Sequence, residues 1–280
     1  MIHGLSWFIL LASIFVQVLT DGDTEGVIFS ATTLNYLNNC TIIKLCENKV
    51  PVIVYLPMDN ISQQKIISTY GCPKIIYLPY VSPAKIQKPT ITSTSRVKPR
   101  EFEHVLVHAR AFKIRSIKKC PFTQTLYLDN DIDIVDLGKV LDWFDVMKSK
   151  KTVISLKNDH TVHHGHDYNV RHTVHERNSG VMYLMCKSSL VEQILEHWEY
   201  AYFHHAAFDH HDQGPLIVTL SKYYDHHESI LDLPENYNCR YDLYEVKRST
   251  CYINHVHETH NRKRLDPKIV GPRNCIISAN

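Results

Sequence analysis

The chain is best understood from one stretch, Thr125-Leu126-Tyr127-Leu128-Asp129-Asn130-Asp131-Ile132-Asp133, in which an apolar run ends in closely spaced aspartates. The apolar residues predict a buried strand. Side chains alternate along an extended chain, so we expect Asp129 and Asp131 to point the same way. Open α/β sheets bind ligands at the carboxyl ends of their strands. Two neighbouring carboxylates there need a cation, and oxygen ligands favour Mg²⁺, Mn²⁺ or Ca²⁺.

The acidic stretch has two other interpretations. An EF-hand loop needs Gly at its sixth position and Glu at its twelfth, where this chain has Ile134 and Val140, so a calcium loop of that kind is excluded. A solvated acidic turn stays open as the structural alternative.

Apolar runs and helix-like segments alternate on both sides of this stretch. Strands are predicted at residues 26–30, 50–55, 74–78 and 180–185, and helices at 33–38, 61–69, 102–115, 189–202 and 215–223. Such alternation is typical of an α/β fold with a mixed, mostly parallel sheet flanked by helices.

Composition excludes several classes of protein. The 280 residues are 44% hydrophobic and 21% charged, as expected of a globular chain with a sizeable core. There are only 9 glycines, and neither G-x-G-x-x-G nor G-x-x-x-x-G-K occurs, which excludes Rossmann and P-loop phosphate sites. H-E-x-x-H and G-x-S-x-G are also absent. A net charge of +2 does not favour nucleic acid as a partner.

The N-terminal region indicates entry into the secretory pathway. Residues 5–19 form an apolar run that is short for a membrane span, so we expect residues 1–22 to be a signal peptide or a short anchor and 23–280 one domain. Sequons begin at Asn39 and Asn60. The eight cysteines lack any C-x-x-C spacing, which favours disulfides of unassigned connectivity. Cys186, in an apolar run, is alternatively a buried thiol.

Residues 110–133, with Leu-Tyr-Leu-Asp-Asn-Asp at their end, resemble the DxD region of nucleotide-sugar glycosyltransferases of the GT-A fold. Later stretches resemble the same superfamily in the same order, and together the similarity covers roughly residues 26–260. The set is most similar to the group related to glycosyltransferase family 8, although the Lys-Pro-Trp ending of that family is absent. These stretches are residues 178–182, 212–216, 233–238 and 253–257.

The resemblance implies a metal site. Asp129 and Asp131 would hold a divalent cation that binds the diphosphate of the donor. A histidine near the C-terminus would be the third ligand, which is His255 or, on the same face of an extended chain, His257. An imidazole beside two carboxylates favours Mn²⁺ over Mg²⁺. In a chain with 19 histidines, an ordinary surface histidine is the structural alternative.

The resemblance also implies which side chains meet the donor nucleotide. Asn130 would lie beside the ribose. Arg110, Lys113 and Arg115 would reach the phosphates, with Lys113 preferred because relatives carry a basic residue in that helix, the alternative being a solvated helix face. Lys263, in a second basic group after the histidine segment, would contact the diphosphate as well.

The remaining matched positions are implied to line the sugar and the reaction centre. Asn178 and Gly180 would lie near the donor sugar and the acceptor. Asp212 and Gln213 resemble the pair at the reaction centre, with Asp212 as base or as a contact to sugar hydroxyls. Asp212 also precedes a predicted helix, so an N-cap role is compatible with its sequence position.

Together these features predict a metal-dependent enzyme that transfers a hexose from a nucleoside-diphosphate sugar, expected to be UDP-linked, to a glycan or protein. We expect it in the ER or Golgi lumen or secreted, with residues 5–19 as an alternative membrane anchor. Two other classes stay open: a catalytically silent GT-A-like binding protein of the lumen, and a secreted histidine-rich metal-binding protein. The histidine-rich residues 160–175 are predicted to be a polar loop.

Overall fold

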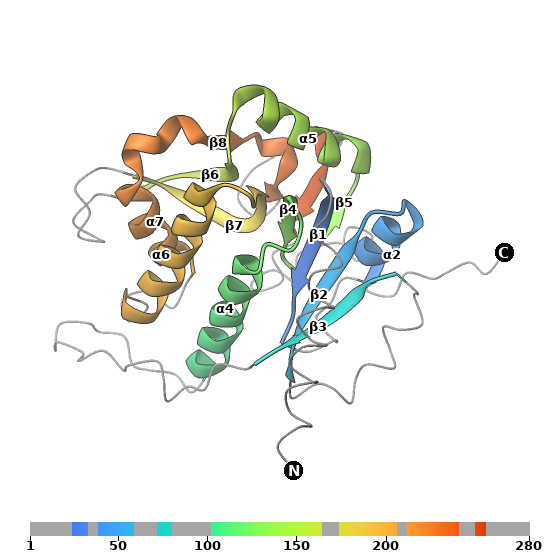
Figure 1. Cartoon of the computed structure of the whole chain (residues 1–280), viewed down its shortest axis with the longest axis horizontal. Helices are drawn as coiled ribbons and strands as arrows, with labels where there is room; N and C mark the ends of the chain where they lie inside the picture. The colour runs from blue at the N-terminus through green and yellow to red at the C-terminus, as the bar shows by residue number, and fades with distance from the viewer. Residues whose placement is uncertain are drawn as a thin grey trace, which may run out of the picture.

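A computed structural model describes residues 24–32, 39–58, 72–79, 102–163, 174–205, 212–240 and 250–255. Its centre is a seven-stranded sheet in the order β3-β2-β1-β4-β7-β6-β8 (Figure 1). Neighbouring strands run parallel except that β7 is antiparallel to β4 and to β6. The predicted α/β class with a mixed, mostly parallel sheet is therefore confirmed. The strands are β1 (Glu25–Ser30), β2 (Val52–Pro57), β3 (Lys74–Leu78), β4 (Gln124–Leu128), β6 (Ile154–His163), β7 (Val174–Met185) and β8 (Ile230–Leu233).

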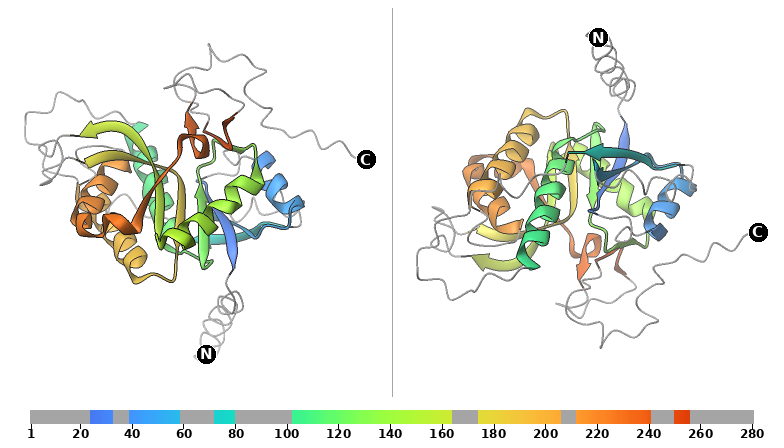
Figure 2. Two further views of the ribbon diagram at one scale, coloured as in Figure 1. Left: turned by 90° about the horizontal axis from the view of Figure 1, so that it is seen from above. Right: turned by 90° about the horizontal axis from the view of Figure 1, so that it is seen from below.

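The sheet has a hydrophobic core on each face, because side chains alternate along its strands. In β4, Leu126 and Leu128 belong to one core and Tyr127 to the other. The first core is covered by α2 (Asn39–Glu47) and α5 (Leu137–Lys150), and the second by α4 (Phe102–Lys118), α6 (Ser189–His205) and α7 (Gln213–Lys222). In Figure 2, α5 lies in front in the view from above and α4 in the view from below. Trp198 and Tyr202, both fully buried in α6, belong to the second core.

A second, three-stranded sheet extends from the end of β4. It contains β5 (Ile132–Ile134), β10 (Ile253–His255) and β9 (Cys239–Arg240) in the order β5-β10-β9. The antiparallel pairing of β10 with β5 places His255 opposite Ile132. Helix α2 supports this sheet, since Thr41 Oγ1 donates to the Ile132 carbonyl at 2.8 Å. The small sheet thus brings a residue from far along the chain next to the acidic turn.

Disulfide bonds join elements that are distant in sequence. The prediction of disulfides is confirmed for the described residues, and Cys186 is bonded rather than free. The described pairs are Cys46–Cys72, Cys120–Cys186 and Cys239–Cys251.

One sequence-based expectation differs from the structure, and three lie outside the described residues. Those three are the helices expected at residues 33–38 and 61–69 and the segment 1–22, while the described helix α2 begins at Asn39. The expected polar loop at 160–175 is wrong at both ends, because β6 and β7 pair as far as His163 and Val174. Backbone hydrogen bonds hold this ladder whatever the polarity of its side chains. Within the described ranges, no helix is both long and apolar enough to cross a membrane.

The buried strand β4 should be the most sensitive part of the sheet. Leu126→Ala removes a side chain that is 0% exposed and should lower the free energy of unfolding by about 2–5 kcal/mol. Urea denaturation followed by circular dichroism measures this change in the free energy of unfolding. Val135→Ala, at a residue 46% exposed, is the control and should change stability by no more than about 0.5 kcal/mol. Equal effects of the two variants would contradict the assignment of β4 to the core.

Candidate functional site

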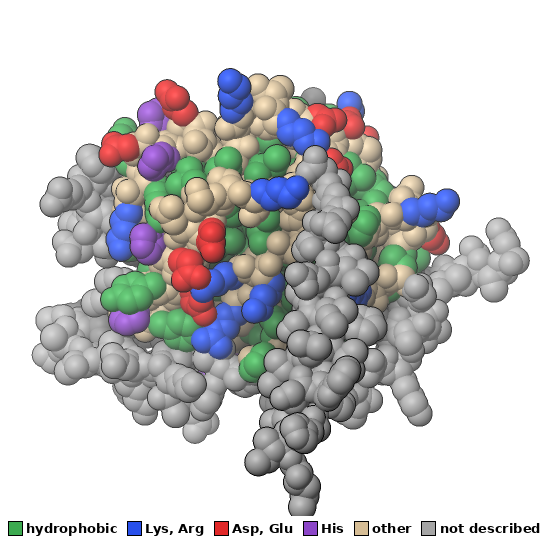
Figure 3. Space-filling view, in the orientation of Figure 1, with side chains coloured by type: hydrophobic (Ala, Val, Ile, Leu, Met, Phe, Trp, Pro, Cys, Tyr) green, Lys and Arg blue, Asp and Glu red, His purple; other side chains and the backbone are tan. Residues whose placement is uncertain are grey.

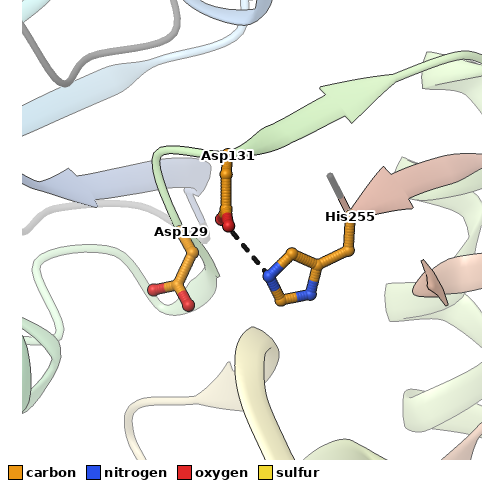
Figure 4. A group of neighbouring side chains, drawn as sticks. All are labelled: Asp129, Asp131 and His255. Carbon is orange, nitrogen blue, oxygen red and sulfur yellow. Dashed lines mark ion pairs between the residues drawn. The ribbon is translucent and has the colours of Figure 1, made fainter. Parts of the chain in front are cut away.

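Two aspartates and a histidine meet where β4 ends. Asp129 and Asp131 lie on the turn between β4 and β5, and His255 comes from β10 (Figure 4). Each offers one ligand atom, and these atoms all lie within 4.8 Å of one another. His255 Nε2 is 3.2 Å from an oxygen of Asp131. The structure thus brings together the three side chains that the sequence suggested as metal ligands.

The two carboxylates reach this position by a turn and not by strand alternation. Strand β4 ends at Leu128, and the Ile132 amide donates to the Asp129 carbonyl at 3.3 Å. The prediction that an extended strand carries Asp129 and Asp131 on one face is therefore wrong, because the chain is no longer extended there. The turn gives the same outcome, because it directs both carboxylates toward His255.

The residue that faces this cluster is Gly180 in β7. Its carbonyl accepts a hydrogen bond of 2.8 Å from the Asp129 amide. A Cβ atom at position 180 would collide with the His255 ring and lie 3.0 Å from Asp129 Oδ2. The absence of a side chain therefore makes room for the cluster. Two carboxylates and one imidazole are a donor set that suits Mn²⁺, so the residues fit the predicted ion.

A buried lysine connects the acidic turn to Asp212. Lys113, on α4, has its Nζ 2.9 Å from Asp129 Oδ1 and 3.0 Å from Asp212 Oδ2. Burial alone would lower the pKa of Lys113, but the neighbouring carboxylates of Asp129 and Asp212 raise it above its ordinary value. Lys113 is therefore a permanent cation between two anions, and the alternative of a solvated helix face does not apply to it.

The Asp212 carboxylate is held ionised and does not cap its helix. It occupies the N-cap position of α7 without a side-chain capping bond. Instead Ser179 Oγ donates to it at 2.6 Å, and Arg110 Nε lies 4.0 Å away. Burial would raise the pKa of Asp212, but the charge of Lys113 and the hydrogen bonds from Ser179 and Lys113 lower it to about 2.

On the other side, Asp129 accepts a hydrogen bond from a tyrosine. Tyr127 Oη donates to Asp129 Oδ1 at 2.7 Å. Burial and then the charge of Asp129 raise the pKa of Tyr127 well above its usual range, so the hydroxyl stays a donor. Asn130 Nδ2 donates to the Ser30 carbonyl at 2.8 Å, while its Oδ1 is buried with no hydrogen-bond partner among the described residues. That oxygen is available to accept from a ligand.

The other predicted positions divide into those near the cluster and those not described. Asn178 is 1% exposed, and its Oδ1 accepts from the Gly180 amide and from Asn238 Nδ2, both at 2.9 Å. These hydrogen bonds connect Asn178 to Gly180, which faces the cluster, and to Asn238. Gln213 is the first residue of α7, next to Asp212. His257 and Lys263 lie outside the described residues.

Four residues with a part in the site received no role from the sequence. One is Tyr127, which donates to Asp129. Ser179 and Asn238 belong to stretches that resemble the glycosyltransferases, and this was the signal that could have found them. Lys157 is 1% exposed and donates to the Asn238 carbonyl at 3.0 Å. Lys157 lies outside those stretches, so no feature of the sequence assigned it to the site.

Not every cation of α4 belongs to the site. Figure 3 shows basic and acidic side chains side by side over α4 and α6. Arg115 and Lys118 each lie 2.8 Å from Glu199. Lys118 also pairs with Glu196 at 2.6 Å, so two cations and two carboxylates form a surface ion-pair group that joins the helices. The expectation that Arg115 reaches the phosphates is therefore wrong.

No known protein family and no curated protein matches the sequence at a significant level. The structure is similar to that of mouse Xyloside xylosyltransferase 1, apo form, with 12% identity, 83% of this chain and 97% of that chain covered, and a TM-score of 0.44. It is also similar to the apo-form glycosyltransferase GlyE of Streptococcus pneumoniae TIGR4 (15% identity, 84% and 55% covered, TM-score 0.47). A third similar structure is that of 4-diphosphocytidyl-2C-methyl-D-erythritol synthase from Anaerococcus prevotii DSM 20548, with 12% identity, 76% of this chain and 89% of that chain covered, and a TM-score of 0.41. These are similarities of chain arrangement, so the function has to be inferred from the side chains.

Removing the Lys113 charge should destabilise the protein strongly. Lys113→Met leaves Asp129 and Asp212 without their counter-ion, which should cost about 3–5 kcal/mol at pH 7. Lys118→Met, on the same helix but with a side chain 30% exposed, is the control and should cost less than about 1 kcal/mol.

The effect should also depend on pH. The pKa of Asp212 is lowered on folding, so the Lys113–Asp212 pair stabilises the protein above pH ~4, and that stability is lost as the pH falls toward 2. The difference between wild type and Lys113→Met should therefore shrink between pH 7 and pH 3 in denaturation midpoints. A constant difference would show that the pair does not hold Asp212 ionised.

A methyl group at position 180 should weaken cation binding. Gly180→Ala places a Cβ against the His255 ring, and should raise the dissociation constant for Mn²⁺ roughly tenfold or more. Isothermal titration calorimetry with MnCl₂ measures it. Gly138→Ala is the matched control, since its nearest atom is Asp136 Oδ1 at 3.5 Å, an ordinary contact. Unchanged affinity in both variants would mean that the ion does not bind between these residues.

Proposed function

We propose that this protein is a metal-dependent glycosyltransferase of the GT-A class, related to family 8, that transfers a hexose from a nucleoside-diphosphate sugar to a glycan or protein. The observation that carries the proposal is the Asp129–Asp131–His255 cluster at the carboxyl end of β4. A cation site at that end of a central strand is where an α/β sheet binds a charged ligand. With neither glycine-rich phosphate motif in the chain, the phosphates of a donor need cationic neutralisation there.

Asp129, Asp131 and His255 would hold Mn²⁺, or Mg²⁺ as the alternative. When bound, the ion would neutralise the donor diphosphate and stabilise the nucleoside diphosphate as it departs. Lys113 and Arg110 carry positive charge on the same side of the cluster. We assign to them the contact with the phosphates or the sugar, while the unsatisfied Asn130 Oδ1 would accept from a ribose hydroxyl.

Asp212 is the residue we assign to the reaction centre, with Gln213 beside it. Because its pKa is lowered to about 2, it is a carboxylate throughout the physiological pH range. An ionised carboxylate accepts hydrogen bonds well but is a weak base. A contact to hydroxyl groups of the donor sugar or of the acceptor therefore suits Asp212 better than proton abstraction.

We propose UDP as the nucleotide and the secretory pathway as the location, with residues 1–22 as signal peptide or anchor and 23–280 as one domain. The three described disulfides support an oxidising compartment.

The proposed function predicts that the protein releases UDP from a UDP-hexose only with a divalent cation, Mn²⁺ or Mg²⁺, and that EDTA stops the release. Asp129→Asn and Asp131→Asn should each reduce UDP release by about 100-fold or more, because each removes a charged ligand of the ion. Asp133→Asn is the control: Asp133 belongs to the same acidic stretch but is exposed on β5 and lies outside the cluster. Its activity should stay near wild type.

Three results would contradict this function. Binding of UDP and Mn²⁺ without hydrolysis or transfer from any UDP-sugar would favour a silent binding protein of the same fold. Binding of several Zn²⁺ or Cu²⁺ ions without nucleotide affinity would favour the histidine-rich metal-binding protein. Loss of activity in Asp133→Asn equal to that of Asp129→Asn would locate the ion elsewhere.

A further inference from the structure

A buried chain of hydrogen bonds lies behind the histidine of the cluster. Asn238 is 0% exposed and follows the short helical turn η6 (Glu235–Tyr237). Its Oδ1 is 2.9 Å from His255 Nδ1, and its Nδ2 donates to Asn178 Oδ1 at 2.9 Å. Asn178 Oδ1 in turn accepts from the Gly180 amide at 2.9 Å. The chain therefore connects the backbone of β7 to the imidazole ring.

The backbone amide of Gly180 determines which group donates in each hydrogen bond of this series. The backbone N–H of Gly180 can only donate, so the Asn178 atom that it meets must be the carbonyl oxygen. The Asn238 atom that faces this oxygen must then be the amino group, which leaves Oδ1 of Asn238 to face His255. An oxygen that can only accept requires a proton on His255 Nδ1.

The position of Asn238 is held from two further directions. Its backbone carbonyl accepts a hydrogen bond of 3.0 Å from the buried Lys157. The next residue, Cys239, is bonded to Cys251, four residues before His255. The amide therefore cannot follow the ring if the ring moves, which allows it to determine the orientation of the ring.

We propose that Asn238 is a positioning residue that keeps His255 in the tautomer with the proton on Nδ1. The unprotonated Nε2 then faces Asp131, and both groups direct lone pairs into the same space, which a divalent cation fills. Asn238 itself does not touch the ion. The inference rests on the metal site of the proposed function, and it explains why a buried asparagine and a buried lysine lie behind that site.

The tautomer can be measured without any enzyme activity. Long-range ¹H–¹⁵N correlation spectra distinguish the protonated from the unprotonated ring nitrogen, and His255→Gln identifies the signals by their loss. In the metal-free wild type we expect a proton on Nδ1, the nitrogen that faces Asn238. In Asn238→Leu, which removes the acceptor at similar size, His255 should change to a mixture of tautomers.

The same variants test the consequence for the ion. Titration with Mn²⁺ alone, followed by the electron paramagnetic resonance signal of the free ion, should show binding weakened by about 10–100-fold in Asn238→Leu. Asn236→Leu, on the same helical turn two residues earlier, should bind Mn²⁺ as the wild type does. Thermal unfolding of both variants separates this effect from a general loss of stability.

Each outcome decides the inference. The absence of a proton from Nδ1 in the wild type overturns it, even if Asn238→Leu does not fold. Wild-type Mn²⁺ affinity in a folded Asn238→Leu also overturns it. The expected tautomer and affinities in a protein that releases no UDP would support the role of Asn238 and contradict the proposed glycosyl transfer, so the two can fail separately.

Discussion

The arrangement of the site depends on one buried ammonium group between two carboxylates. Lys113 contacts both Asp129 and Asp212, which come from β4 and from the start of α7. Asp212 is buried and Asp129 only partly exposed, so the two carboxylates need the cation that lies between them. Because α4 carries that cation, the packing of one helix against the sheet fixes the distance between the Asp129–Asp131–His255 cluster and Asp212.

Behind the ligands, the site is built from buried and fully engaged polar groups. Ser179, Asn178 and Asn238 are each at most 2% exposed. Ser179 donates to Asp212, and Asn178 accepts from the Gly180 amide and from Asn238. In contrast, Asp129 and Asp131 remain 26% and 29% exposed at their side chains. A rigid interior that presents partly accessible acceptors is suited to binding an ion or a ligand from solution.

Much of this architecture could be predicted from the sequence, and what could not has physical reasons. A continuous apolar run was enough to predict the strand around Leu126, and the alternation of such runs with helix-like segments was enough to predict the mixed sheet. The grouping of Asp129 and Asp131 with His255 came from an ordered set of motifs, since nothing in the composition links residues 124 positions apart in the chain. The role of Lys157 and the direction of the Asn238 amide could not be predicted, because both depend on distances between strands that only the folded register determines.

The β10–β5 pairing has a consequence for folding as well as for chemistry. A small three-stranded sheet buries little surface, and alone it would open more readily than the seven-stranded sheet. An ion held jointly by the acidic turn and by His255 would bind only when β10 is docked, and would therefore slow the local opening of this strand. The supply of the cation would then determine how long β10 remains closed to proteases and to exchange with water.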